Sequence, residues 1–212
     1  HQLKQISLHP LPDDVDGLPP DQIIDQSARF RATFRILEEI HAKGEKALIF
    51  IDDLLWIERL RLMVQDHFQL ERMPLAITGN VSGEKRKALV DELQTLPGFQ
   101  VLFMTPRAGG VGLTVTAANH VIHLSRWWNP AVEDQATDRV YRIGQTRPVF
   151  VYYPLAIHPD WPGSSFDERL HEHLERKRSL SRQLLLPGQF SDREVAELFD
   201  ATVGPVDVHP TR

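Results

Sequence analysis

Residues Gln100–Tyr153, QVLFMTPRAGGVGLTVTAANHVIHLSRWWNPAVEDQATDRVYRIGQTRPVFVYY, carry the clearest structural pattern of the chain. Short apolar runs at Val101–Thr105, His120–Leu124 and Val149–Tyr153 indicate strands that are buried on both faces, as in parallel sheets. Between the last two runs, a polar segment over Pro130–Tyr141 predicts a helix, since proline is favoured in a first helical turn. Strands and helices therefore alternate, as they do in α/β folds.

The same alternation extends upstream. Apolar runs at Ala47–Ile51 and Leu75–Thr78 predict two more strands, and amphipathic or capped segments predict helices over Ser27–Lys43, Leu54–Phe68 and Ser82–Leu96. We therefore expect a three-layer α/β domain with a mainly parallel sheet, followed by C-terminal helices. In such domains the functional loops lie beyond the carboxyl ends of the strands.

The sequence divides into four predicted parts. Residues 1–25 are rich in proline and aspartate and form a leading segment without a core of its own; residues 26–156 form the α/β lobe. Residues 157–200 form C-terminal helices, with capping boxes at Ser165–Glu168 and Ser191–Glu194, and residues 201–212 form a frayed tail. The chain does not begin with Met, so we expect it to be a piece of a longer protein.

Composition excludes some classes of protein and leaves others open. The 212 residues are 42% apolar and 25% charged, as in ordinary globular domains, and they contain no cysteine for a disulfide or a Cys-based zinc site. No apolar run approaches the roughly 20 residues that span a bilayer. The net charge is −5, but residues 101–150 carry five arginines against three acids. A local basic surface for nucleic acid is therefore compatible with the overall charge.

The predicted helix Pro130–Tyr141 and its end have a polar repeating face. The side chains that recur at three- and four-residue steps are amide, carboxylate and guanidinium groups, which are costly to bury without a ligand or partner. They are Gln135, Asp138, Arg139 and Arg142. The alternative is a solvated face on which Glu133 and Asp134 pair with the arginines.

The glycine-rich loop Gly109–Gly112 follows a predicted strand. It does not match the dinucleotide pattern G-x-G-x-x-G, and the chain has no phosphate-binding G-x-x-x-x-G-K-[ST] sequence. It is either a tight connection that needs positive φ or a loop whose backbone approaches a phosphate or a nucleic-acid strand.

Several segments resemble, in order and spacing, the SNF2 family of ATP-dependent DNA translocases. They are LKQISLHP, KALIFID, ITGNVSGEKRKALVDEL, GGVGL, WWNPAVEDQATDRVYRIGQTRPV and SFDERLHEHLERKRSL. These segments are similar to the second RecA-like lobe of that family and to the brace helix that follows it. The resemblance therefore implies a RecA-like fold and the role of second motor lobe in an ATP-dependent double-stranded DNA translocase.

The resemblance also implies roles for individual residues. Arg139 and Arg142 are similar to arginine fingers that reach the γ-phosphate of ATP, and they are the implied catalytic residues. On the nucleotide side the implied residues are Gln135, Asp138 and Gly112. The implied DNA-binding residues are Thr105, Arg107, Gly109, Gly110 and Trp128. For Trp127 and Trp128, packing under the sheet edge is the alternative, and for Lys85–Lys87 the alternative to phosphate contact is a solvated helix end.

The implied cofactors are ATP and Mg²⁺, bound mainly by a first lobe, and no metal site is expected in this chain. The sequence has neither a Walker A lysine nor a D-E-x-H carboxylate pair, so the chain alone is not expected to hydrolyse ATP. The implied partners are double-stranded DNA and the N-terminal RecA-like lobe of the same protein, with no membrane. The implied location is the cytoplasm, at the nucleoid, of a bacterium, or the nucleus of a eukaryote.

Two other functions and two departures remain. The lobe could be a non-catalytic DNA- or protein-binding module, or a free-standing dinucleotide or nucleotide-sugar enzyme, although no base or hydride site for the latter is evident. Ser125 stands where the SNF2 family often has Asp, and it is followed by Arg126. Pro106 replaces a residue that is usually Thr or Leu.

Overall fold

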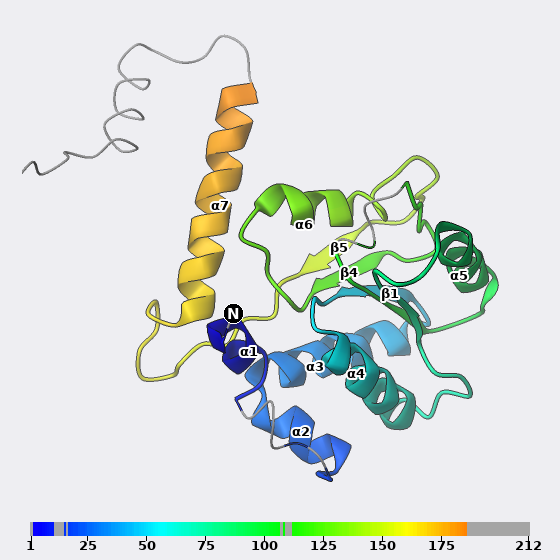
Figure 1. Ribbon diagram of the computed structural model, residues 1–212, viewed down its shortest axis with the longest axis horizontal. Coiled ribbons are helices and arrows are strands. Elements are labelled where there is room, and N and C mark those ends of the chain that lie inside the picture. Colours follow the sequence, from blue (N-terminus) through cyan, green and yellow to red (C-terminus); the bar gives the residue numbers. More distant parts are fainter. Residues whose placement is uncertain (1, 11–14, 16, 107, 109–111, 186–212) are drawn as a thin grey trace, which may run out of the picture. The chain divides into compact units, whose positions relative to one another are not determined.

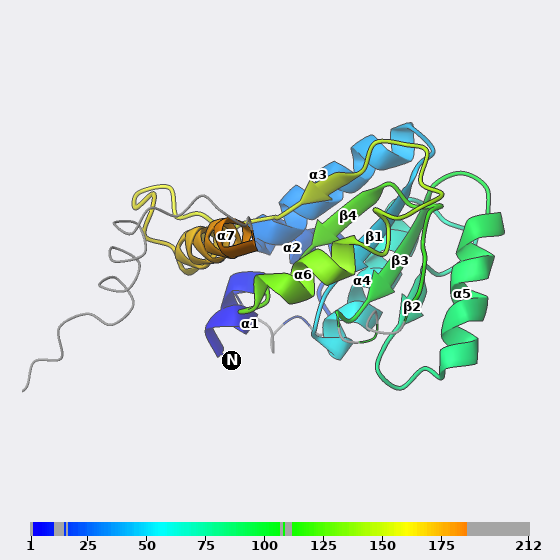
Figure 2. The same cartoon turned by 90° about the horizontal axis from the view of Figure 1, so that it is seen from above.

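The computed structural model describes residues 2–10, 15, 17–106, 108 and 112–185. Its five-stranded sheet is parallel throughout and has the order β2-β3-β1-β4-β5 (Figure 1, Figure 2). The strands are β1 Lys46–Phe50, β2 Leu75–Ile77, β3 Gln100–Met104, β4 His120–His123 and β5 Phe150–Tyr152. Each lies within one residue of a predicted strand, and the predicted mainly parallel sheet is confirmed.

Both faces of the sheet are covered by helices, so the predicted three layers are also confirmed. Helices α3 (Ala28–Ala42) and α4 (Leu54–His67) pack on one face, where alternate β1 side chains such as Ile49 join their core. Helices α5 (Gly83–Thr95) and α6 (Pro130–Thr137) cover the other face, and Leu48 belongs to that second core. Figure 1 shows the strands between α6 on one side and α3 and α4 on the other, and Figure 2 shows the same sheet from above, with α5 next to β2.

Polar side chains cap the helices that follow the strands. The Asp53 side chain accepts hydrogen bonds from the backbone N–H groups of Leu55 and Trp56 and so caps α4. The Asn129 side chain accepts a hydrogen bond from the Ala131 backbone N–H at the start of α6. Asp53 follows β1 and Asn129 follows β4, so these connections lie at the carboxyl edge of the sheet. This is the edge where ligand sites form in open α/β sheets.

The predicted helix Pro130–Tyr141 is wrong in its last turn. α6 ends at Thr137, and the Val115 N–H donates to the Arg139 carbonyl oxygen at 2.8 Å. This carbonyl is therefore engaged by a distant strand connection instead of the next helical turn. The chain continues through tight turns, with Gly144 at φ 102°. Arg139 and Arg142 consequently lie in turns after α6 and not on its face.

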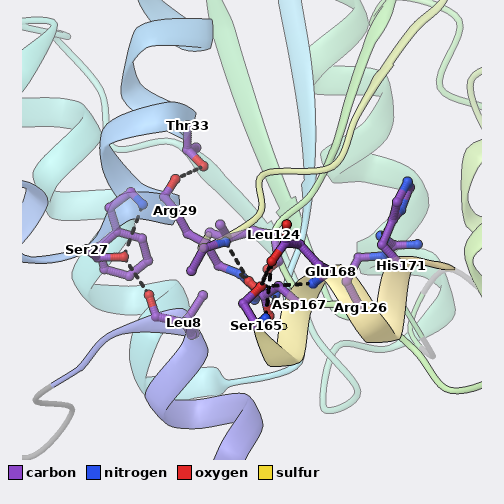
Figure 3. Close-up of polar contacts among 12 residues, drawn as sticks. Leu8, Ser27, Arg29, Thr33, Leu124, Arg126, Ser165, Asp167, Glu168 and His171 are labelled. Atoms are coloured by element: carbon purple, nitrogen blue, oxygen red, sulfur yellow. Dashed lines mark hydrogen bonds and ion pairs between the residues drawn. The ribbon is translucent and has the colours of Figure 1, made fainter. Parts of the chain in front are cut away.

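Two short helices lie in the leading segment, where the sequence showed no periodicity. They are α1 (Gln2–Leu8) and α2 (Pro20–Gln26). Leu8, Val15, Ile23 and Ile24 are buried in the core formed by α3 and α4. The Ser27 hydroxyl donates to the Leu8 carbonyl oxygen at 2.6 Å (Figure 3). The segment therefore packs on the lobe.

Helix α7 spans Phe166–Leu185 and begins with the predicted capping box. The Glu168 N–H donates to Ser165 Oγ at 3.2 Å, and the Ser165 N–H donates back to Glu168 Oε2 at 3.1 Å. The chain divides into two compact units, 1–175 and 176–212. The predicted helix over 191–199 and the tail 201–212 lie outside the described residues. No helix in the described part is long and apolar enough to cross a membrane.

Candidate functional site

The candidate site begins with the turns after α6, which we call the finger segment (residues 138–145). Arg139 is 6% exposed, whereas Asp138 and Arg142 are exposed. The structure brings the charges of Asp138, Arg139 and Arg142 close enough to interact. Gln135 is exposed on α6, one turn before Arg139. The single polar face predicted from the sequence is therefore split into one buried and several exposed side chains.

Arg139 has an unusual environment for a guanidinium group. Burial lowers the pKa of Arg139, and the nearby positive charge of Arg142 lowers it further, while Asp138 acts in the opposite direction. Its Nε is buried and has no hydrogen-bond partner among the described residues. A buried donor next to a second positive charge is costly unless an anion binds there.

A glutamine that the sequence did not single out holds the finger segment in place. Gln145 Nε2 donates to the carbonyl oxygens of Ala118 at 2.7 Å and Thr116 at 3.1 Å, and its Oε1 accepts from the Arg147 N–H at 3.0 Å. With the Val115–Arg139 bond, these contacts fix the finger segment to the stretch that precedes β4. No sequence periodicity could reveal the bonds to Thr116, Ala118 and Val115, because they join residues 24 to 29 positions apart in the chain.

The glycine-rich loop is described only at its ends. Arg107, Gly109 and Gly110, for which the family resemblance implies DNA binding, lie outside the described residues. Thr105 is half-buried just after β3, and its N–H donates to the Ile77 carbonyl oxygen at 3.1 Å. Gly112 has φ 54°, a conformation that favours glycine.

Arg86 on α5 supports this loop. Its Nη1 donates to the Ala108 carbonyl oxygen at 3.2 Å and its Nη2 to the Gly79 carbonyl oxygen at 3.0 Å. The neighbouring Lys85 and Lys87 are exposed. The basic triplet thus contains one arginine that ties two loops together, which neither sequence interpretation had anticipated.

The tryptophan loop after β4 borders a cleft at the carboxyl edge of the sheet. Trp128 is 56% exposed and lies edge-on to Phe166, with ring centroids 6.2 Å apart, whereas Trp127 is half-buried. The cleft has a volume of about 320 Å³. Its walls are formed by residues of α1, α3, α7 and the loops after β1 and β4: Gln5, Leu8, Arg29, Asp52, Asp53, Ser125, Arg126, Trp128, Phe166 and Leu170.

The two departures from the family pattern have different outcomes. Ser125 Oγ accepts a weak hydrogen bond from the Asp52 N–H at 3.3 Å, and the next residue, Arg126, forms a buried ion pair with Glu133 at 2.9 Å. Pro106 is buried, and the structure does not explain why it replaces the usual residue. Among the described residues, no group of three or more His, Asp or Glu side chains could hold a metal ion.

Comparisons with known proteins agree with this geometry. The family described as "Helicase conserved C-terminal domain" matches residues 30–144. Zorya protein ZorD from Escherichia coli is 39% identical over 191 residues, which are 87% of this chain and 17% of ZorD. The putative ATP-dependent helicase/translocase YwqA from Bacillus subtilis is 34% identical over 205 residues, 93% of this chain and 21% of YwqA.

Solved structures give the same result. The Sulfolobus solfataricus SWI2/SNF2 ATPase core in complex with dsDNA has a TM-score of 0.67 at 31% identity, covering 87% of this chain and 36% of that chain. The C-terminal part of the Fun30 ATPase domain has a TM-score of 0.61 at 26% identity, covering 73% of this chain and 47% of that chain.

The parallel sheet with helices on both faces, together with these matches, defines a RecA-like lobe of the helicase type. The chain belongs to the helicase conserved C-terminal domain family, and its relatives are SNF2-family ATPases. It spans about a fifth of the length of ZorD and of YwqA, and it corresponds to the C-terminal lobe of the family.

Proposed function

We propose that this chain is the second motor lobe of an ATP-dependent double-stranded DNA translocase, and that Arg139 and Arg142 are its arginine fingers. The observation that carries the proposal is the buried Arg139 guanidinium, whose Nε has no partner among the described residues and whose neighbour is another arginine. Two adjacent guanidinium groups form a binding site for the equatorial oxygens of a transferring phosphoryl group. ATP supplies that group when it is bound, with Mg²⁺, by the first lobe.

Apolar exposure beside the fingers supports a second surface that closes on them. Tyr141 is 72% exposed and Ile143 is 98% exposed, and both lie within two residues of Arg142. Together with Gln145 and Pro148 they border a shallow depression of about 630 Å³. Exposed apolar groups around a charged centre are typical of a surface that is covered in the assembled protein. We assign this surface to the N-terminal RecA-like lobe of the same protein.

The DNA track is assigned to the loops at the carboxyl edge of the sheet, whereas the finger segment is bonded to the residues that precede β4. Thr105, the glycine loop and Trp128 follow β3 and β4, and the relative solved with dsDNA is similar in fold over most of the chain. Glycine backbone can approach a phosphate closely, and an exposed indole can contact a groove. The first residues to test for DNA contact are therefore Thr105, Arg107, Gly109, Gly110 and Trp128.

Arg142→Ala in the full-length protein tests the finger assignment. We expect DNA-stimulated ATP hydrolysis to fall by about 10³-fold or more, while the Kd of a fluorescent ATP analogue changes by less than about tenfold. Arg72→Ala is a matched control, because Arg72 is a surface arginine that pairs with Glu92 at 3.4 Å, with the Arg72 side chain 70% exposed. Turnover that survives Arg142→Ala would make the assignment wrong. DNA binding without any hydrolysis by the wild type would favour the non-catalytic module.

A further inference from the structure

Arg126 is buried at the carboxyl end of β4, and, unlike Arg139, it is fully engaged. Its Nε donates to Glu133 Oε1 at 2.9 Å and its Nη2 donates to Glu133 Oε2 at 3.2 Å. The side chains are 1% and 0% exposed. This is a bidentate ion pair between the end of β4 and the first turn of α6, the helix that leads into the finger segment.

The same guanidinium group reaches two further elements. Its Nη1 lies 2.9 Å from Nδ1 of His171 on α7 (Figure 3), and its central carbon lies 4.3 Å from the ring centroid of Tyr153, the residue after β5. Because a guanidinium group only donates, His171 Nδ1 is the acceptor in this bond. One buried side chain therefore joins β4, α6, α7 and the end of β5.

Glu133 is held in its ionised state by these contacts. Burial alone would raise the pKa of Glu133, but the hydrogen bonds and charge of Arg126, with the Trp127 N–H that donates at 2.8 Å, hold it below its usual range. The carboxylate thus joins the tryptophan loop to α6 through a backbone bond as well as an ion pair.

Besides the Gln145 bonds, contacts along α6 and the finger segment attach them to the rest of the lobe. At the start of α6, Glu133 binds Arg126. At the end of α6, Thr137 Oγ1 lies 2.9 Å from His123 Nε2. In the finger segment, the Arg139 carbonyl oxygen accepts a hydrogen bond from the Val115 N–H. Of these, the Glu133 contact continues through Arg126 to His171 on α7. A displacement at the start of α7 therefore has a direct route, through one charged side chain, to the helix that carries the fingers.

We propose that Arg126 and Glu133 are positioning residues for the arginine fingers, and that Arg126 couples the start of α7 to the finger segment. Neither residue touches the nucleotide in this scheme; they set where Arg139 and Arg142 lie when the lobes close. The inference about turnover rests on the proposed function, while the inference about the position of the finger segment does not. A misplacement of about 1 Å costs on the order of 10²-fold in rate.

The test uses the full-length protein with saturating double-stranded DNA and four variants: Arg126→Met, Glu133→Met, the double Arg126→Met/Glu133→Met, and His171→Phe. Each single removal of a charge is expected to lower Tm and to lower kcat for ATP by about 10- to 100-fold, with KM changed by less than about twofold. The double variant removes both charges and leaves apolar groups of similar volume, which is often neutral for stability. We therefore expect its Tm to recover while its kcat stays at least about tenfold low.

Recovery of both Tm and kcat in the double variant would overturn the positioning role, because the pair would then be merely structural. His171→Phe is expected to lower kcat by at least about threefold, and an unchanged kcat would overturn the link to α7.

Hydrogen exchange gives a readout that does not need hydrolysis. The amides of Val140 and Arg142 are bonded to Thr137 and Val140, and we expect them to exchange about tenfold faster or more in the double variant and in His171→Phe. Wild-type exchange rates in both variants would overturn the proposal even if the protein proves to have no ATPase. A wild type without DNA-stimulated hydrolysis would contradict the proposed function alone.

Discussion

The buried ion pair between Arg29 and Asp167 connects α3 to the start of α7, and its removal is the most quantitative test of the fold. Arg29 Nε and Nη2 each donate to Asp167 at 2.7 Å, and Arg29 Nη1 donates to the Leu124 carbonyl oxygen at 3.0 Å (Figure 3). The Asp167 side chain also accepts from the Ala156 N–H at 2.7 Å. The two side chains are 3% and 0% exposed. Asp167→Ala removes three of these four bonds and leaves a buried, unpaired guanidinium group.

Removal of one partner from a buried ion pair lowers the free energy of unfolding by about 3–5 kcal/mol. In a unit of 175 residues each kcal/mol corresponds to roughly 2–4 °C, so Tm should fall by about 10 °C. Thermal unfolding followed by far-UV circular dichroism measures Tm, and urea titration of the same chain measures the free energy of unfolding. The double variant Arg29→Met/Asp167→Leu should lie within about 2 kcal/mol of the wild type, because no charge stays buried alone. Glu92→Ala, which breaks an exposed pair, should cost less than about 1 kcal/mol. If Asp167→Ala cost no more than Glu92→Ala, the reasoning about this pair would be wrong.

Two further predictions concern the amino edge of the sheet and the finger segment. Glu45 forms hydrogen bonds with His120 at 2.6 Å and Asn119 at 2.9 Å, and these bonds lower the pKa of Glu45. The ionised carboxylate therefore stabilises the folded chain at pH values above its unfolded pKa of about 4.3. This contribution is lost as the pH falls through the lower pKa of the folded state. Urea titrations should therefore show wild type more stable than Glu45→Gln at pH 6, with the difference closing below about pH 4, and a difference independent of pH would contradict this. Gly144→Ala should destabilise the chain by about 1–3 kcal/mol, since φ is 102° although a Cβ would meet only Thr116 Cγ2 at 3.7 Å. An unchanged urea midpoint would show that the backbone there can relax.

The strands could be predicted from the sequence because each lies in a short apolar run, and the three central strands β3, β1 and β4 are almost wholly buried on both faces. β1 and β4, for example, are almost wholly buried, so their sequences carry no polar alternation to confuse the pattern. The capping residues Ser82 and Ser165 could also be predicted, since a cap depends on residues only three positions apart.

Long-range contacts could not be predicted in this way. The predicted end of α6 was wrong because the Arg139 carbonyl oxygen accepts a hydrogen bond from Val115, 24 residues earlier in the chain. Helix propensity depends on neighbouring residues and cannot predict that bond. Arg126 is a single arginine after a strand, and its partners lie 7 and 45 residues further on. The helices of the leading segment are seven residues each, and isolated helices of that length are not stable. They are stabilised here because Leu8 and Ile23 pack against the lobe.

The central claim is that this chain contributes the fingers to a nucleotide site whose other half lies on a first lobe. The most direct measurement is ATP hydrolysis by the full-length protein and by residues 1–212 alone, each with and without double-stranded DNA. We predict hydrolysis by the full-length protein that DNA stimulates, and none above background by the isolated chain. Appreciable DNA-stimulated turnover by residues 1–212 alone, or none by the full-length protein, would contradict the account.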